Sequence, residues 1–363
     1  MSLLAWSVLE ALLRNWAIVA IASTIVTLLV VPALVILKYV RISLQIMRTT
    51  KPPLSRRPLD FERVVGDAVR FTASDGLRLS GMLIRANPLV RRRGMVIFAH
   101  EFCSDMYSCA RYCRPLQQAG YDVFTFDFRG HGQSDSDPDY SPRQWVSDRE
   151  IADMRGAVSY VGQWLEEHGY AREIGLFGIS RGACAAIVAA RTCPEIRAIV
   201  ADGAFSTDRT IEHFMKRWAY IFAKVRIVYE NHHPAFWKFL RWSMMHVARR
   251  EFRCSFPSVR KVIKHMTPRP ILFIHGEKDS YLPVEQSRLL YALAPEPKYF
   301  WIAPGARHNQ AVLLHCDLYS RVTAGFFDRH LACPLAAPAT AAAGRNGEPR
   351  VRMRPAVSLT AAG

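Results

Sequence analysis

The chain has 363 residues, half of them hydrophobic, which is enough for a sizeable core in one domain with additions. Its 48 Lys and Arg against 31 Asp and Glu give a formal net charge of +17, which suits contact with nucleic acid or an anionic membrane surface. The eight cysteines lack zinc-ligand spacing, so the composition argues against a zinc protein and favours free, mostly buried thiols.

Residues 16–37 carry no charged side chain and predict a transmembrane helix. About 22 residues at a rise of ~1.5 Å each can cross a ~30 Å hydrocarbon core. A secretory signal peptide is the alternative, but the apolar run exceeds the usual h-region of about 7 to 15 residues and no small-x-small cleavage site closes it. Residues 1–15 form a short N-terminal segment before this helix.

Basic side chains follow the apolar run and are scarce before it, where only Arg14 stands. They are Lys38, Arg41, Arg48, Lys51, Arg56 and Arg57. By the positive-inside bias, the globular domain is expected in the cytoplasm. Residues 38–60 also hold three prolines, so we expect a basic linker there that lies along acidic lipid headgroups.

The globular domain is expected over residues 61–333. It opens with two alternating stretches in residues 68–86 that predict a hairpin. Residues 95–99 and 121–126 read as buried strands, and residues 148–168 have the apolar spacing of a helix that packs on a sheet.

The sequence Gly178-Ile179-Ser180-Arg181-Gly182 stands between a short apolar strand and an alanine-rich helix. The glycines allow the strand and helix backbones to pass closely, which forces a tight turn and exposes the serine hydroxyl above the sheet. The motif alone is weak, but this context predicts that Ser180 is a nucleophile.

Two later loops supply the partners that a serine nucleophile needs. Asp279 follows the apolar strand at residues 271–274, which places a carboxylate just past the end of a strand. His308 follows a strand at residues 299–302 and is the expected base. Asp202, at the end of another buried strand, is the reserve candidate for the acid. The chain order Ser, Asp, His separates this arrangement from the other common serine-hydrolase orders.

Four stretches together resemble the α/β-hydrolase superfamily: the turn at Ser180, His275-Gly276-Glu277-Lys278-Asp279, Gly305-Ala306-Arg307-His308-Asn309, and residues 127–134. Their combination is similar to the branch of serine aminopeptidase-like and acyl-protein-thioesterase-like enzymes. The resemblance implies an α/β-hydrolase fold, with a mostly parallel central sheet flanked by helices, and a Ser-His-Asp triad.

The resemblance also implies an oxyanion hole in which the backbone N–H groups of Phe102 and Arg181 receive the developing negative charge. The sequence departs from the family pattern at Glu101, where the family has glycine, and a side chain there narrows the backbone angles of the loop. His100 and His131 are expected to pack or form hydrogen bonds, because His308 already serves as the base.

A helical lid is expected at about residues 205–268, because some 65 residues are too many for a bare connection. Its aromatic and basic side chains favour a bilayer surface or an acyl pocket, although many of them can simply pack the lid onto the domain. No nucleic-acid module accompanies them. The adjacent pair His232-His233 does not make a metal site, and residues 334–363 have the composition of a disordered tail.

These features predict a membrane-anchored serine hydrolase that cleaves an ester or thioester of a small-molecule or lipid acyl substrate through an acyl-enzyme. It requires no metal or organic cofactor and binds no nucleic acid. A serine peptidase of the aminopeptidase type and an inactive hydrolase-fold scaffold remain the alternatives. The sequence does not indicate an oligomeric state.

Overall fold

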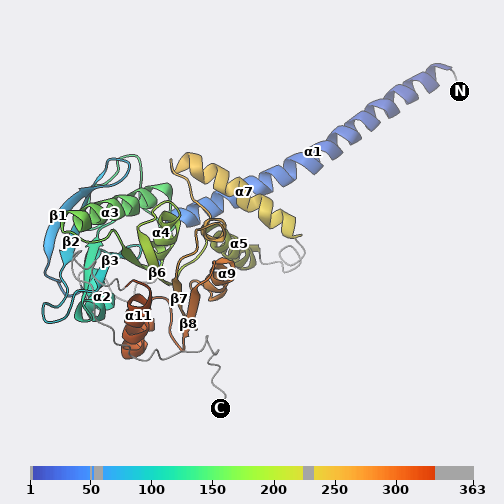
Figure 1. Ribbon diagram of the computed structural model, residues 1–363. Helices are drawn as coiled ribbons and strands as arrows, with labels where there is room; N and C mark the ends of the chain where they lie inside the picture. The colour runs from blue at the N-terminus through green and yellow to red at the C-terminus, as the bar shows by residue number, and fades with distance from the viewer. Residues whose placement is uncertain (1–2, 50, 53–59, 224–232, 332–363) are drawn as a thin grey trace, which may run out of the picture. The chain divides into compact units, whose positions relative to one another are not determined.

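The computed structural model describes residues 3–49, 51–52, 60–223 and 233–331 (Figure 1). The chain divides into two compact units. One contains the long N-terminal helix and residues from the interval 211–251, and the other contains the sheet with its helices. Each unit is described by itself.

The larger unit is built on one eight-stranded sheet in the order β1-β2-β4-β3-β5-β6-β7-β8. The strands are β1 Asp67–Thr72, β2 Arg78–Ile84, β3 Gly94–Ala99, β4 Tyr121–Phe126, β5 Ile174–Ile179, β6 Ile196–Asp202, β7 Ile271–Gly276 and β8 Lys298–Ala303. The pairs β1–β2 and β2–β4 are antiparallel, and every pair from β4 to β8 is parallel. The expected hairpin and mostly parallel sheet are confirmed.

The central strands are apolar at nearly every position because both faces of the sheet are covered. All six residues of β4, β5 and β7 are buried, and successive side chains of a strand point to opposite faces. The edge strand β8 differs, since its first five residues are only half-buried. This sheet therefore has a closed centre and a more open margin at β8.

Helices cover both faces of the sheet (Figure 1). They are α2 Cys109–Gln118, α3 Asp148–Glu167, α4 Arg181–Ala190, α8 Val259–Lys264, α9 Glu285–Leu293, α10 Ala311–Leu314 and α11 Cys316–His330, with a 3₁₀ turn at Met106–Ser108. α2 and α11 pack together on one face, while α3, α4, α8 and α9 form the layer on the other. This two-sided arrangement is the α/β-hydrolase fold.

The smaller unit is helical. It contains α1 Leu3–Thr49, α7 Pro234–Glu251 and all but the first turn of α5 Thr207–Ala223. The last part of α1 contacts α7. On each of the two helices the buried apolar residues are three or four positions apart, so they lie on one face of the helix. The buried residues include Val40, Leu44 and Met47 on α1 and Trp237, Leu240 and Met244 on α7. An ion pair between Arg48 and Glu251 joins the same two helices.

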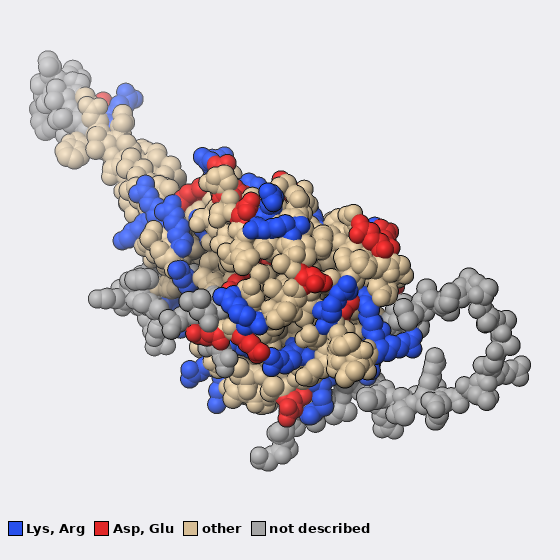
Figure 2. Space-filling view, turned by 90° about the vertical axis from the view of Figure 1, so that its left-hand side faces the viewer, with Lys and Arg blue, Asp and Glu red and all other residues tan. Residues whose placement is uncertain are grey.

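The helix α1 is long and apolar enough to cross a membrane, and an N-terminal signal sequence would meet the same criteria. Trp16 and Leu28 are 70% and 67% exposed, so no protein core covers this stretch. Figure 2 shows the apolar length of α1 in tan, without acidic or basic side chains along its middle.

The basic linker at residues 38–60 stays a prediction, and its first part is helical, because α1 continues to Thr49. No glycine or proline stands between Lys38 and Lys51, so nothing in the sequence stops the helix there. Prolines begin at Pro52, and residues before a proline disfavour the helical conformation. Residues 53–59 lie outside the described residues.

The interval 205–268 is helical over most of its described length, since it holds α5, α7 and α8. Its function as a lid stays a prediction. The expected tail at residues 334–363 and His232 of the adjacent histidine pair lie outside the described residues.

Candidate active site

Ser180 lies in the turn between β5 and α4, in a backbone conformation that residues other than glycine rarely adopt. Its φ is +52° and its ψ is −113°. Such backbone angles cost free energy and persist only where the surroundings enforce them. A Cβ added to Gly182 would lie 2.2 Å from the carbonyl oxygen of Ala99, and one at Gly178 would lie 2.5 Å from the backbone of Ala183. Both glycines are therefore required for this turn.

Three predicted side chains meet at this turn, although up to 128 positions separate them. The hydroxyl Oγ of Ser180 lies 3.1 Å from Nε2 of His308. The other ring nitrogen, Nδ1 of His308, lies 2.7 Å from Oδ2 of Asp279. An ionised carboxylate can only accept, so Nδ1 carries the proton and Nε2 is free to accept the serine proton. All three side chains are buried.

The carboxylate of Asp279 is held from several directions. Its Oδ1 accepts hydrogen bonds from the N–H groups of Tyr281 at 2.9 Å and Leu282 at 2.8 Å. Burial by itself would raise the pKa of Asp279, but His275 and His308 beside it hold that pKa well below its usual range. Asp279 is therefore ionised at neutral pH and fixed in orientation.

Gly203 gives His308 room to approach. It follows β6 directly and has a φ of +66°. A Cβ at this position would lie 3.3 Å from Cε1 of His308 and 3.2 Å from Oδ1 of Asn309. Gly203 was not among the predicted site residues, although an Asp-Gly pair at the end of a buried strand is a signal for a constrained turn.

The predicted oxyanion donors lie on two neighbouring segments. Arg181 is the first residue of α4, where backbone N–H groups have no acceptor within the helix. Phe102 lies in the turn after β3, and its ring centroid is 4.9 Å from the guanidinium carbon of Arg181. The side chain of Arg181 is fully buried, donates to the carbonyl of Arg143 at 3.0 Å and lies 3.5 Å from Oε1 of Glu150. This buried pair was not foreseen.

Glu101, the departure from the family pattern, turns its carboxyl inward. The residue is 4% exposed, and its Oε2 accepts a hydrogen bond from Oγ of Ser108 at 3.4 Å. Burial raises the pKa of Glu101, and the neighbouring Arg111 and His308 oppose this effect. The positive φ of the loop falls on Cys103, at +63°.

The other candidates stand apart from the serine. Asp202 accepts a hydrogen bond from the hydroxyl of Tyr319 at 2.8 Å, and burial raises its pKa to about 6. His100 accepts from the N–H of Phe128 at 3.1 Å, which links two loops of the site. Burial and the charge of Arg181 lower the pKa of His131 to about 3, so this imidazole is neutral. None of these side chains has a hydrogen bond to Ser180 among the described contacts.

Within the described ranges, no three His, Cys, Asp or Glu side chains are grouped to hold a metal ion. The seven cysteines in those ranges are free, and Cys333 lies outside them. Burial raises the pKa of the Cys109 and Cys184 thiols to about 12, so both are protonated at neutral pH.

The order of the sheet and the turn at Ser180 between β5 and α4 are those of the α/β-hydrolase fold. Residues 90–235 match the Hydrolase_4 family, described as serine aminopeptidase, S33. This range runs from the loop before β3 past β6 and includes Ser180, while Asp279 and His308 follow it.

Several known proteins are similar to the chain. The uncharacterized protein YfhR of Escherichia coli K12 is 27% identical over 258 residues, which are 70% of this chain and 77% of YfhR. The uncharacterized protein YqkD of Bacillus subtilis is 25% identical over 64% of this chain and 70% of its own length. Among solved structures, the Pyrococcus furiosus esterase Pf2001 aligns with a TM-score of 0.53 and 25% identity, over 77% of this chain and all of that one.

Proposed function

We propose that the protein is a serine hydrolase that cleaves an ester or thioester through a Ser180-His308-Asp279 triad. The observation that carries the proposal is the pair of contacts at 3.1 Å and 2.7 Å that joins the three side chains in the order required for nucleophilic catalysis. The family match and the likeness to an esterase support the same reaction class.

In the proposed mechanism, Nε2 of His308 takes the proton from Ser180 as its Oγ attacks the substrate carbonyl carbon. Asp279 keeps the imidazole in the required tautomer and stabilises the imidazolium that forms. The carbonyl oxygen becomes negative and is received by the N–H groups of Phe102 and Arg181. His308 then donates its proton to the leaving alcohol or thiol, and water releases the acyl group by the same steps in reverse order.

The substrate class is proposed from the smaller unit. The apolar stretch of α1 supports a membrane anchor, and the basic residues that follow it support a cytoplasmic catalytic domain. On α7, Phe239 is 48% and Trp242 63% exposed, which suits contact with acyl chains. These features favour lipids or other membrane-derived acyl compounds over small soluble esters.

A peptidase of the aminopeptidase type is the second candidate, and the family description favours it. Such an enzyme needs an accessible acid to hold a free amine. The acid nearest the predicted oxyanion residue Phe102 in sequence is Glu101, which is 4% exposed and already accepts from Ser108. Glu101 is therefore not available to hold a free amine.

Hydrolysis of a short p-nitrophenyl ester tests the proposal. Replacing Ser180→Ala is expected to reduce kcat/KM on the order of 10⁶-fold, or to background, because the nucleophile is lost. The matched control is Ser206→Ala, which changes another buried serine outside the triad and is expected to keep activity within a few-fold. Undiminished turnover by a folded Ser180→Ala protein would refute the assignment.

A further inference from the structure

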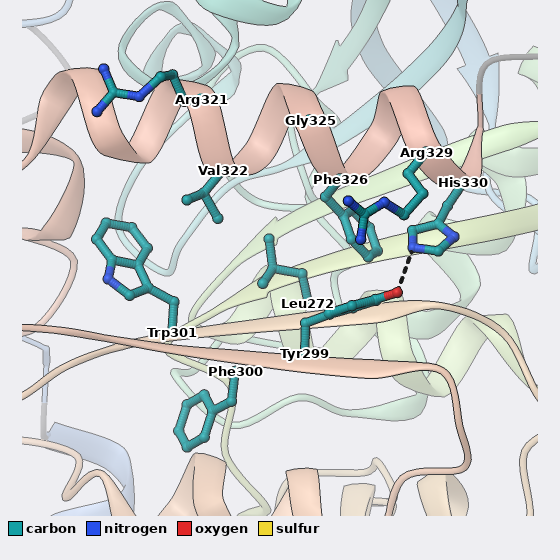
Figure 3. Close-up of a pocket in the computed structure, with 10 residues that line it drawn as sticks. All are labelled: Leu272, Tyr299, Phe300, Trp301, Arg321, Val322, Gly325, Phe326, Arg329 and His330. Atoms are coloured by element: carbon teal, nitrogen blue, oxygen red, sulfur yellow. Dashed lines mark hydrogen bonds between the residues drawn. The ribbon is translucent and has the colours of Figure 1, made fainter. Parts of the chain in front are cut away.

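A cavity lies between the edge strand β8 and helix α11 (Figure 3). Its volume is about 470 Å³, within the range of roughly 300 to 1,000 Å³ that is usual for small-molecule sites. Neither Ser180, Asp279 nor His308 lines it. The cavity therefore differs from the proposed catalytic site and has no assigned role.

The walls of this cavity are apolar and partly aromatic. Figure 3 shows Val322 and Phe326 pointing from α11 toward β8, with Leu272 and Trp301 rising toward them from the sheet. Trp301 is half-buried, because β8 is the last strand of the sheet. Such walls suit an aliphatic chain, which gains about 0.8 kcal/mol for each CH₂ group removed from water.

Gly325 lies in the middle of α11, where it lowers helix stability by about 1 kcal/mol relative to alanine. A Cβ added there would meet no atom within 4 Å, so close packing does not explain the glycine. What the missing side chain provides is space, since Gly325 lines the cavity.

Charge at the cavity is positive. Arg321 and Arg329 line it, one turn before and one turn after Gly325, and no Asp or Glu is among the described residues that line it. Asp328, the residue before Arg329, contacts Arg93 at 2.6 Å and the hydroxyl of Tyr121 at 2.8 Å.

His330 adds a hydrogen bond rather than charge at this end of the cavity. Its Nε2 lies 3.1 Å from the hydroxyl of Tyr299. Burial and the neighbouring Arg329 lower the pKa of His330, so the imidazole is neutral at pH 7. The positive charge therefore comes from the guanidinium groups, whose planar donors match a carboxylate.

We propose that this cavity binds the anion of a long-chain fatty acid. The chain lies along Trp301, Val322 and Phe326, and the carboxylate pairs with Arg329, whose side chain points toward Tyr299 (Figure 3). The site is independent of the proposed hydrolysis, because it shares no residue with the triad.

Photolabelling of the full-length Ser180→Ala protein in neutral phosphatidylcholine nanodiscs, with palmitate that carries a diazirine, tests the proposal. Peptide mapping is expected to find the label in β8 and α11. Unlabelled palmitate is expected to compete at a concentration at least tenfold lower than methyl palmitate, which has the same chain without the charge. Equal competition by palmitate and methyl palmitate would overturn the proposal. So would an anionic phospholipid that suppresses the labelling as effectively as unlabelled palmitate.

Single-residue variants distinguish binding in the cavity from nonspecific adsorption to a hydrophobic surface. Gly325→Leu is expected to abolish labelling of α11, because leucine fills the cavity while being a better helix former than glycine. Gly325→Ala is the matched control and retains most labelling. Arg329→Gln is expected to lower labelling at least tenfold. An unchanged Tm shows that each variant is folded, and unchanged labelling of Gly325→Leu would contradict the proposal.

Other occupants give different results, and each would overturn the proposal. If a second copy of the chain covers the cavity, labelling falls as protein concentration rises and a dimer is seen at the same concentrations. If the chain's own C-terminal residues fill it, labelling appears only after truncation beyond Leu331.

Discussion

Ser180 combines an unusual backbone conformation with an ordinary hydrogen-bond partner. Its φ of +52° depends on glycine at positions 178 and 182, because neighbouring backbone atoms leave no room for a side chain there. At 3.1 Å from His308, the hydroxyl is positioned before any substrate arrives. This pre-organisation reduces the entropy that the proposed reaction must lose when its groups are aligned.

Replacing Asp279→Asn is predicted to lower kcat for ester hydrolysis on the order of 10³- to 10⁴-fold, because an amide can donate to Nδ1 and so favour the wrong tautomer of His308. Steady-state kinetics on the purified variant measure this loss. Asp202→Asn is the control, since Asp202 bonds to Tyr319. An equal loss in both variants would mean that Asp279 has no special role.

Gly203→Ala is predicted to reduce kcat on the order of 10- to 100-fold, because the added methyl group presses on Cε1 of His308 and displaces the ring. Gly305→Ala is a matched control with the same φ of +66° and open space around its Cβ. Both variants lose roughly 1–2 kcal/mol of stability from the left-handed conformation. Similar kinetics for the two would show that backbone strain alone accounts for the effect.

The proximity of the three residues of the proposed triad could be predicted more easily than the contacts that surround them. Ser180, Asp279 and His308 stand beside strand ends with recognisable turn residues, and a parallel sheet brings such ends to one edge. Gly203, Tyr319 and the buried side chain of Arg181 are set by contacts between distant segments. No local spacing in the sequence encodes those contacts.

At the scale of elements, Arg129 connects the turn after β4 to neighbouring elements through hydrogen bonds and ion pairs. Arg129 is 1% exposed, and its Nε and Nη2 lie 2.9 Å and 2.6 Å from Oδ1 of Asp153 on α3. The same side chain reaches Asp75 in the β1–β2 turn at 2.8 Å and Asp137 at 3.1 Å. Arg129 therefore ties the hairpin, the turn and α3 together.

Arg129→Met is predicted to lower the free energy of unfolding by about 3 to 5 kcal/mol, because three carboxylates would lose their buried counter-charge. Denaturant titration measures the change. Arg114→Met breaks the exposed pair with Glu62 and is expected to cost less than about 1 kcal/mol. Equal free energies of unfolding for the two variants would show that the interactions of Arg129 do not stabilise the fold.

Elements with strong local patterns were predicted well, such as the buried strands and α3, whose Ser147 and Glu150 form a capping box. The continuation of α1 beyond residue 37 could not be predicted from composition, because a basic stretch that leads into prolines is typical of a linker. Helix propensity without a stop signal, together with the contact to α7, outweighs that compositional change.

At the scale of the whole molecule, the chain joins an α/β-hydrolase unit to a helical unit that carries an exposed apolar stretch. The fold class followed from the resemblance of four stretches to the α/β-hydrolase superfamily. The grouping of residues 211–251 with α1 could not be predicted, because it depends on helix contacts between segments about 200 positions apart.

The proposed anchor predicts that the protein keeps residues 1–37 and resists extraction of membranes at alkaline pH. The resistance follows from the cost of exposing about 22 apolar residues to water, and the retention follows from the lack of a small-x-small cleavage site after the apolar run. Peptide mapping of the membrane fraction by mass spectrometry is expected to recover peptides from residues 1–37. A soluble product that lacks the apolar stretch would identify a cleaved signal sequence instead.

The central claim is that Ser180 is an activated nucleophile, and labelling with a fluorophosphonate probe tests it most directly. The account predicts one covalent adduct, mapped by mass spectrometry to Ser180, which His308→Ala strongly reduces because the base at 3.1 Å is gone. Folded protein that remains unlabelled, or that carries the adduct on another residue, would contradict it.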